Sequence, residues 1–381
     1  MLLLGGWAYE REDCNAVPET RRALDSLIDL GLGLRRAATG ERLFDPVEVT
    51  NHLKSAGLAG HNSFWADRYV RTGRRLVTDL AGRRAGNIEV DFRRTFNAST
   101  IAMGKSVRLR APLPLRSVYG DSLQIHPFVE GASGAQLSMT DGRLEARLTA
   151  VEGDLTLGAR LKFACEKELS HDFSAADNSI YLKPREGLIV ISDAVRALAA
   201  SLASSQASPD SALRAFWHYM IDELACGAVH YDQIRADAPC DTVLDMGWYD
   251  CQLGSALFVA LCRSHGIPAR IASGHLLYRR APTNHYWAEV WLDDQGWLPF
   301  DFLSWDLSLG GSDLQWRDHF YGRVDDRMVT QLLPLKFTGA LGLALPNAWH
   351  ILQAAKDDGV TISLMPLTGG RIYSDFISVS N

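Results

Sequence analysis

The chain has 381 residues, of which 47% are hydrophobic and 22% charged, the composition of a folded globular protein rather than a disordered one. One hydrophobic core rarely serves more than about 250–300 residues, so at least two domains are expected. The formal net charge of −6 excludes a generally basic protein that binds nucleic acid through bulk electrostatics.

Membrane and disulfide signals are weak in this sequence. No stretch approaches the roughly 18 apolar residues of a membrane-spanning helix, and the apolar start at residues 1–4 meets charge at Glu10 and Arg11. The six cysteines are too sparse for a disulfide scaffold, and none form CxxC pairs. We therefore expect a cytoplasmic protein without a structural zinc site.

Residues 1–85 are predicted to form a helical N-terminal segment. Within residues 20–34, apolar side chains recur at the helical period, at Leu24, Leu27, Ile28 and Leu32. The pattern assigns this segment no particular fold.

Residues 86–186 are predicted to form a β-sandwich. Apolar and polar residues alternate there in short runs that Gly and Pro separate, a pattern typical of strands. About 100 residues of this kind favour two packed sheets. The runs lie at residues 88–92, 107–110, 144–151, 155–163 and 180–182.

The helical period returns over residues 187–325. Ser208 is placed to cap a helix that begins at Pro209, and another helix is predicted from Cys251 to about residue 264. Strands follow near residues 269–278, 285–292 and 297–302. Helices beside antiparallel strands indicate an α+β core. Residues 326–381 are predicted to add strands that complete or cover this core.

Cys251 lies at the start of its predicted helix, where Asp250 can act as the N-cap. Free backbone N–H groups and the positive end of the helix dipole stabilise a thiolate at such a position. The same N–H groups can hold an oxyanion during acyl transfer. We interpret Cys251 as a nucleophile rather than as a buried structural thiol.

A base and a carboxylate are predicted on two neighbouring strands. Alternation along residues 285–292 places His285 at the start of one strand face. The turn after this strand makes a hairpin that can bring Asp301 back towards His285. A thiolate, a base that exchanges its proton and a carboxylate that orients the imidazole are the groups that nucleophilic catalysis requires. The candidate catalytic residues are therefore Cys251, His285 and Asp301.

Three stretches resemble signatures of the transglutaminase-like superfamily of papain-type cysteine enzymes. They are DCQLGSALFVALCRSHGIPARIASGHL at residues 250–276, NHYWAEVWL at residues 284–292 and GWLPFDF at residues 296–302. The resemblance implies a papain-like core in which Cys251 is the nucleophile, His285 the base and Asp301 the orienting acid. The thiol and the imidazole suffice for this chemistry, so neither a metal nor an organic cofactor is implied.

One position departs from the family pattern. Many members have glycine two residues before the cysteine, where this chain has Tyr249. Trp248 and Tyr249 are therefore candidates for a wall around the acyl site, and Trp287 is a third candidate for this substrate pocket. Six of the ten tryptophans fall between Trp248 and Trp316, which indicates a largely apolar surrounding. A dry site disfavours hydrolysis.

The triad predicts a thioester acyl-enzyme on Cys251, which water, an amine or a carbon nucleophile can attack. Within the superfamily the chain looks most like Dieckmann cyclases of antibiotic biosynthesis. These release a carrier-bound polyketide or nonribosomal peptide by closing a tetramate or pyridone ring. The alternatives are an amide-forming transglutaminase homologue, a thioester or peptide hydrolase, and a non-enzymatic scaffold with a vestigial triad.

An arginine-rich stretch indicates an acidic partner. Residues 68–94, from Arg68 to Arg94, hold eight arginines against three acidic residues. Acyl carrier proteins are acidic and deliver thioesters, so this stretch is a candidate docking site for a carrier protein. The alternative is an ordinary solvated face. Neither nucleic acid nor a membrane is expected as a partner.

Overall fold

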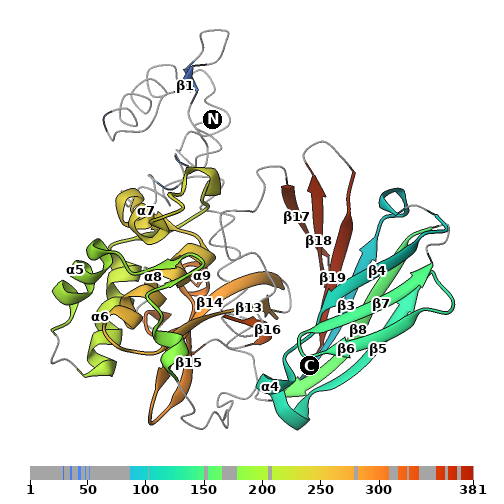
Figure 1. The fold of residues 1–381 in the computed structure, drawn as a ribbon, viewed down its shortest axis with the longest axis horizontal. Coiled ribbons are helices and arrows are strands. Elements are labelled where there is room, and N and C mark those ends of the chain that lie inside the picture. Colours follow the sequence, from blue (N-terminus) through green and yellow to red (C-terminus); the bar gives the residue numbers. More distant parts are fainter. Residues whose placement is uncertain are drawn as a thin grey trace.

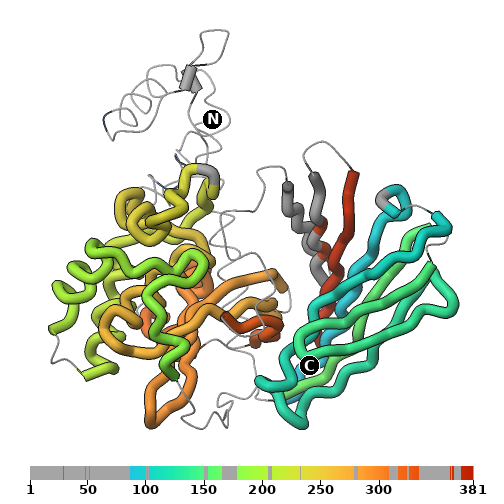
Figure 2. Tube along the Cα trace, viewed as in Figure 1, coloured from blue at the N-terminus to red at the C-terminus, as the bar shows by residue number. Residues whose placement is uncertain are grey.

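The computed structural model consists of two lobes that lie side by side (Figure 1). One is an α+β lobe of helices packed on a sheet, and the other is a β-sandwich. Figure 2 traces the chain through both lobes. The residues that the structure describes are 29, 35–36, 42–43, 48, 51, 86–101, 103–149, 153–164, 178–204, 208–278, 282–308, 316–323, 326–333, 349–356, 359–366 and 370–380.

Only isolated positions of the N-terminal segment are described. Strands β1 (Arg35–Arg36) and β2 (Arg42–Leu43) pair there in antiparallel fashion. The predicted helix at residues 20–34 lies outside the described residues, apart from Asp29, which is helical.

The sandwich is built from a six-stranded and a three-stranded sheet, with the orders β17-β18-β19-β3-β8-β5 and β4-β7-β6. The side chains that alternate inward along β3 and β8 are apolar, and they form the core between the sheets. The strands are β3 (Asn87–Phe96), β4 (Ser106–Pro112), β5 (Gln124–Glu130), β6 (Gln136–Thr140), β7 (Arg143–Thr149), β8 (Leu155–Ala164), β17 (Trp349–Lys356), β18 (Gly359–Pro366) and β19 (Tyr373–Ser380).

The strand predicted at residues 180–182 is wrong, because this run is part of a 3₁₀-helix, η3 (Asn178–Leu182). A run of three residues is too short for its apolar–polar alternation to identify a strand reliably, because one tertiary contact can favour another conformation. Here the ring of Tyr181 packs edge-on against Trp297 at a centroid distance of 4.7 Å.

Residues 326–381 were predicted to add strands that complete or cover the core of the α+β lobe. Only some of the C-terminal strands do so. Strand β16 (Arg327–Leu332) does join its sheet, but β17–β19 extend the sandwich, where β19 pairs with β3 (Figure 1). Ile377 of β19 lies opposite Phe92 of β3 and continues its apolar face. β19 therefore pairs with β3 because the apolar faces of the two strands match. The residue pattern of β19 alone does not reveal this partner.

The α+β lobe contains an antiparallel sheet of order β15-β14-β13-β16, with helices packed on one face. The predicted strands near residues 269–278, 285–292 and 297–302 correspond to β13 (Ala269–Leu276), β14 (Thr283–Leu292) and β15 (Gly296–Phe300). The helices are α5 (Asp193–Leu202), α6 (Pro209–Asp222), α7 (Pro239–Met246), α8 (Cys251–Ser264) and α9 (Phe302–Leu307).

Short elements connect these parts. Helix α4 (Arg116–Tyr119) belongs to the sandwich. The remaining elements are η1 (Ala98–Thr100), η2 (Gly120–Ser122), η4 (Tyr231–Gln233), β9 (Arg185–Glu186), β10 (Ile189–Val190), β11 (Ala225–Cys226) and β12 (Trp248–Tyr249). No helix among the described residues has the length and apolarity needed to cross a membrane.

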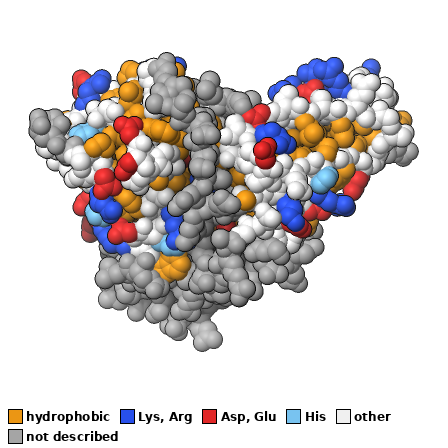
Figure 3. Space-filling model, turned by 90° about the horizontal axis from the view of Figure 1, so that it is seen from below, with side chains coloured by type: hydrophobic (Ala, Val, Ile, Leu, Met, Phe, Trp, Pro, Cys, Tyr) orange, Lys and Arg blue, Asp and Glu red, His pale blue; other side chains and the backbone are white. Residues whose placement is uncertain are grey.

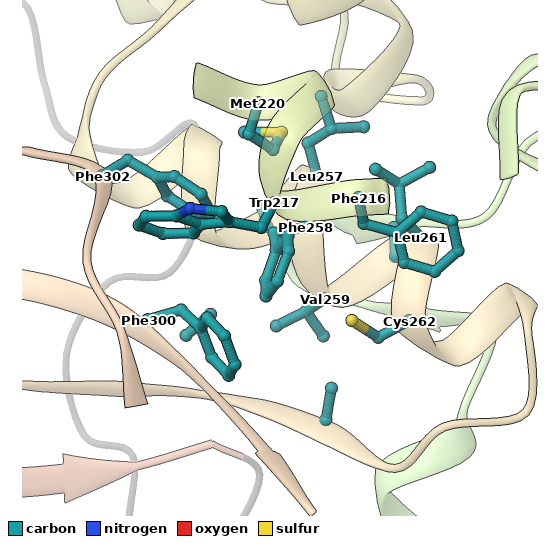
Figure 4. Close-up of a cluster of buried hydrophobic side chains, with 14 of the residues drawn as sticks. Phe216, Trp217, Met220, Leu257, Phe258, Val259, Leu261, Cys262, Phe300 and Phe302 are labelled. Carbon is teal, nitrogen blue, oxygen red and sulfur yellow. The ribbon is translucent and has the colours of Figure 1, made fainter. Parts of the chain in front are cut away.

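Helix α8 is the central helix of the α+β lobe. It is buried from Gln252 to Arg263 because it lies between the other helices and the sheet. Trp217 of α6 stacks on Phe302 at 5.0 Å, and Phe258 of α8 lies 5.1 Å from the ring of Phe300 (Figure 4). These rings fix the start of α9 and the end of β15 relative to α8.

The sandwich anchors the sheet of the α+β lobe. Tyr119 donates a hydrogen bond of 2.7 Å to the carbonyl of Arg327 and accepts one of 2.8 Å from the N–H of Val329. Trp287 of β14 and Met328 of β16 belong to the same buried cluster as Phe92 of the sandwich. The far face of this sheet is thus covered by the second lobe.

A buried ion pair joins β13 and β14. Arg270 and Glu289 lie directly opposite each other, with guanidinium–carboxylate distances of 2.7 and 2.9 Å. The Arg270 guanidinium also lies 3.9 Å from the ring centroid of Trp297. Glu289 accepts a further hydrogen bond from the indole of Trp287. The carboxylate of Glu289 therefore binds groups from both β13 and β14.

We predict that Glu289→Ala lowers the free energy of unfolding by about 3–5 kcal/mol, because it leaves a buried guanidinium without its counter-charge. Urea unfolding measures the loss. Asp245→Ala is the matched control, since it breaks the exposed pair of Arg235 and Asp245 and should cost about 0–1 kcal/mol. Equal losses in the two variants would show that burial does not decide the strength of this pair.

Candidate active site

Cys251 is the first residue of α8, as the sequence predicted. The Asp250 carboxylate accepts the backbone N–H groups of Gln252 and Leu253 at 3.1 and 2.9 Å, so it is the N-cap. Cys251 is partly exposed, whereas Cys226, Cys240 and Cys262 are buried. Among the described cysteines, a substrate can therefore reach Cys251 most readily.

His285 and Asp301 form a buried hydrogen bond. The Nε2 atom of His285 lies 2.8 Å from Oδ1 of Asp301, and the two side chains are 0% and 1% exposed. The β14–β15 hairpin brings them together, because Ala288 pairs with Phe300 and Asp301 follows directly. The predicted hairpin and the predicted approach of Asp301 to His285 are both present.

Asp301 is held by several donors besides His285. Its Oδ1 atom accepts the backbone N–H groups of Leu303 and Ser304 at 3.0 and 3.1 Å, so Asp301 also caps α9. Its Oδ2 atom accepts the hydroxyl of Ser304. These contacts fix the carboxylate plane and satisfy the charge that burial would otherwise penalise.

The electrostatics favour a protonated imidazole. Burial alone would lower the pKa of His285, but the negative charges of Asp301 and Cys251 and the hydrogen bond to Asp301 raise it to about 10. Burial would raise the pKa of Asp301, yet the imidazolium of His285 holds it below its usual value. Since Nε2 is bound to Asp301, Nδ1 is the ring nitrogen left for the Cys251 sulfur.

Two further groups beside the nucleophile were missed from the sequence. The hydroxyl of Tyr231 donates to both oxygens of Asp250, at 3.1 and 2.8 Å. Burial, followed by the charge of Cys251, raises the pKa of Tyr286 to about 12. Tyr286 directly follows His285, so the sequence could have indicated that Tyr286 lies near the site. Nothing in the sequence links Tyr231 to Asp250.

The structure corrects the predicted role of Tyr249 as a pocket wall. Its side chain is fully buried, and its hydroxyl donates to the carbonyl of Met220 at 3.0 Å. Its ring fills the space beside Gly254, where an added Cβ would lie 2.4 Å from the ring. Tyr249 therefore belongs to the core beneath α8 and does not contact a substrate.

Trp287 is likewise buried, but it contacts the triad. Its ring stacks near His285, with a centroid distance of 6.3 Å and an interplanar angle of 25°. It therefore supports the imidazole from the side of the sandwich rather than lining an open pocket. Trp248 is partly exposed and precedes the nucleophile by three residues, so it stays a predicted wall of the site.

The expected apolar surrounding rests on fewer tryptophans than the sequence indicated. Trp291 and Trp297 form a separate cluster with Tyr181. Trp305 and Trp316 belong to the main core of the α+β lobe. Trp287, one of the six tryptophans between Trp248 and Trp316, is the one described above as stacked beside His285.

Comparison with known proteins agrees with this geometry. Residues 196–302 match the model of the transglutaminase-like superfamily, and this range contains Cys251, His285 and Asp301. No curated protein matches the chain.

Two solved structures are similar at low identity. A protein from Cytophaga hutchinsonii that is proposed to be a cysteine protease is 13% identical, with a TM-score of 0.45, covering 78% of this chain and 99% of that chain. The periplasmic domain of TgpA from Pseudomonas aeruginosa is 18% identical, with a TM-score of 0.35, covering 62% of this chain and 95% of that chain.

We predict that iodoacetamide at neutral pH alkylates Cys251 well ahead of Cys226, Cys240 and Cys262. Cys251 faces the imidazolium of His285, whereas burial raises the pKa of Cys240 to about 12. Peptide mapping after brief labelling identifies the site. Similar alkylation rates at Cys251 and the buried thiols would contradict an activated nucleophile.

Proposed function

The chain belongs to the transglutaminase-like superfamily through residues 196–302, and on this premise we propose that it is an enzyme that transfers an acyl group through a thioester on Cys251. The observation that carries the proposal is the 2.8 Å hydrogen bond between His285 and Asp301 behind a cysteine at the N-terminus of α8. This arrangement supplies a nucleophile, a proton carrier and an orienting carboxylate.

The first step is acylation of Cys251. Its thiolate attacks the thioester carbonyl of the substrate, the carbon–sulfur bond to the carrier breaks, and the imidazolium of His285 protonates the departing thiolate to a thiol. Asp250 already accepts the N–H groups of Gln252 and Leu253. We therefore assign the backbone N–H of Cys251, at the same helix end, as a donor to the oxyanion that forms on the substrate carbonyl.

Acylation prepares His285 to act as a base. The charge of Cys251 is one of the two charges that raise the pKa of His285, and the acyl-enzyme no longer carries it. The pKa of His285 therefore falls after acylation, and its neutral imidazole can accept a proton from the next reactant.

For the second step we propose an intramolecular Dieckmann cyclisation, which releases a polyketide or peptide chain as a tetramate or pyridone. His285 takes a proton from a carbon between two carbonyl groups, and the enolate carbon attacks the acyl carbonyl. A carbon–carbon bond forms, the carbon–sulfur bond breaks, and Cys251 leaves as a thiolate. The burial of His285 and Asp301 supports this route, because a water-poor site favours an attached nucleophile over hydrolysis.

The proposed substrate is bound to an acidic acyl carrier protein in the cytoplasm, where such chains are assembled. Two arginines of the predicted docking stretch at residues 68–94 are described, and both already form ion pairs. Arg93 lies 3.1 Å from Asp91 and from Glu130, and the partly buried Arg94 lies 2.7 Å from Asp375. The other arginines of the stretch lie outside the described residues.

A second basic surface lies on the outer face of β4 and β7. Arg108, Arg110 and Arg147 all approach one carboxylate, that of Glu145, at 3.2 to 3.4 Å. Three guanidinium groups against one carboxylate leave positive charge for an acidic partner. Figure 3 shows basic side chains gathered on the sandwich, and we propose that this surface contributes to carrier docking.

A small-molecule β-ketoacyl-aminoacyl thioester tests the proposed reaction. We predict that the wild-type protein releases a product whose mass equals the substrate minus the thiol, as cyclisation requires. Cys251→Ala is the control and should give no product. The product mass is read by liquid chromatography with mass spectrometry.

Other products would replace the cyclase assignment. A product that gains water indicates a hydrolase, and a product that forms only with added amine indicates an amide synthase. No turnover, together with no selective alkylation of Cys251, would favour a scaffold with a vestigial triad.

A further inference from the structure

Asp301 is the end of a longer chain of buried hydrogen bonds. The Ser304 hydroxyl lies 2.5 Å from Oδ2 of Asp301, and the Tyr278 hydroxyl lies 3.0 Å from the Ser304 oxygen. All three side chains are buried. They come from different places in the fold: Tyr278 follows β13, Ser304 belongs to α9, and Asp301 follows β15.

The direction of the chain follows from the protons available. An ionised carboxylate can only accept, so Ser304 donates its single hydroxyl proton to Asp301. The Ser304 oxygen then has only acceptor capacity left, and the hydroxyl of Tyr278 must be the donor between these two groups. The phenol, the serine hydroxyl and the imidazole therefore all direct protons towards the carboxylate.

The two oxygens of Asp301 have separate partners. Oδ1 accepts Nε2 of His285 and the backbone N–H groups that begin α9. Oδ2 accepts the hydroxyl of Ser304. The hydroxyl thus prevents the carboxylate from rotating away from the imidazole, which the contacts to Oδ1 alone would not do.

We propose that Ser304 and Tyr278 are positioning residues that keep Asp301 ionised and aimed at His285, extending the triad to five side chains. Neither residue touches the substrate. The proposal rests on the nucleophilic cysteine of the proposed function, but not on cyclisation.

Within the described part of the protein, the charged and titratable groups that act on Asp301 and His285 are the following. Burial raises the pKa of Asp301, and the charge and hydrogen bond of His285 together with the bonds from Ser304 more than reverse this effect. Tyr249 is a further titratable side chain near Asp301, and burial raises the pKa of its phenol, which therefore stays neutral. Asp250 and Cys251 face His285 from the start of α8.

An ordinary helix-stabilising role is the alternative for Ser304, and Ser308 provides the control. Ser308 is buried one turn later, and its hydroxyl donates to the carbonyl of Trp305 at 2.8 Å. It is a buried serine of the same helix end, but its hydroxyl bonds to the carbonyl of Trp305 and not to Asp301. Loss of either hydroxyl can reduce stability, whereas only loss of the Ser304 hydroxyl should affect His285.

The experiment compares Ser304→Ala, Ser304→Thr, Tyr278→Phe and Ser308→Ala with the wild-type protein. Nitrogen NMR of the imidazole gives the pKa of His285 in each, with the signal assigned by its loss in His285→Gln. The iodoacetamide rate at Cys251 gives a second readout that needs no substrate. Urea unfolding reports stability separately.

We expect Ser304→Ala to lower the pKa of His285 by about one pH unit, since a hydrogen bond to a carboxylate is worth roughly that much. Without its donor, the buried Oδ2 makes ionised Asp301 less stable, so the imidazolium loses part of its counter-charge. Tyr278→Phe should give a smaller decrease, and Ser304→Thr should restore the wild-type value. Alkylation of Cys251 should slow in the same order, with Ser308→Ala unchanged.

An unchanged pKa of His285 in Ser304→Ala, or an equal decrease in Ser308→Ala, would overturn the proposal. If Ser304→Ala does not fold, Tyr278→Phe decides, because it removes one oxygen atom and leaves Ser304 in place. An unchanged His285 pKa there would overturn the five-residue chain. Failure of the cyclisation assay alone would leave these readouts valid and would revise only the proposed reaction.

Discussion

The contact between the imidazole of His285 and the carboxylate of Asp301 is the constraint on which the site depends. A charged pair that is almost fully removed from water is costly unless its remaining hydrogen-bonding groups are satisfied. The fold meets this condition with the hairpin register, the cap of α9 and the hydroxyl of Ser304. The buried rings of Phe300 and Phe302 on either side of Asp301 fix its backbone in the core.

The side chains along β14 and the sandwich behind them hold His285 in place. Along one face of β14, His285 binds Asp301, Trp287 stacks beside it, and Glu289 binds both Trp287 and Arg270. The sandwich covers this face through the shared core, so the second lobe stabilises the imidazole without contributing a reacting group. Most of the conspicuous side chains that follow His285 in β14 therefore support His285 and do not react themselves.

The positions of Cys251, His285 and Asp301 could be predicted because their signals are local. Asp250 caps the helix that begins at Cys251, and the alternation and turn of the hairpin place Asp301 near His285. Other features depend on distant partners. Tyr249 becomes a core residue because of the Met220 carbonyl, and β19 joins the sandwich because its inner face matches that of β3. Tyr278 and Ser304 meet only when the folded chain brings β13 beside α9.

Trapping the acyl-enzyme tests most directly whether this buried pair makes Cys251 a nucleophile. The protein is mixed with a short acyl thioester, quenched in acid, weighed intact and mapped by peptide. We predict that the acyl mass accumulates on Cys251, is absent from Cys251→Ala, is nearly absent from His285→Ala and forms slowly in Asp301→Asn, where the imidazole loses its proper orientation. Acylation at another residue, or an undiminished rate in Asp301→Asn, would contradict the account.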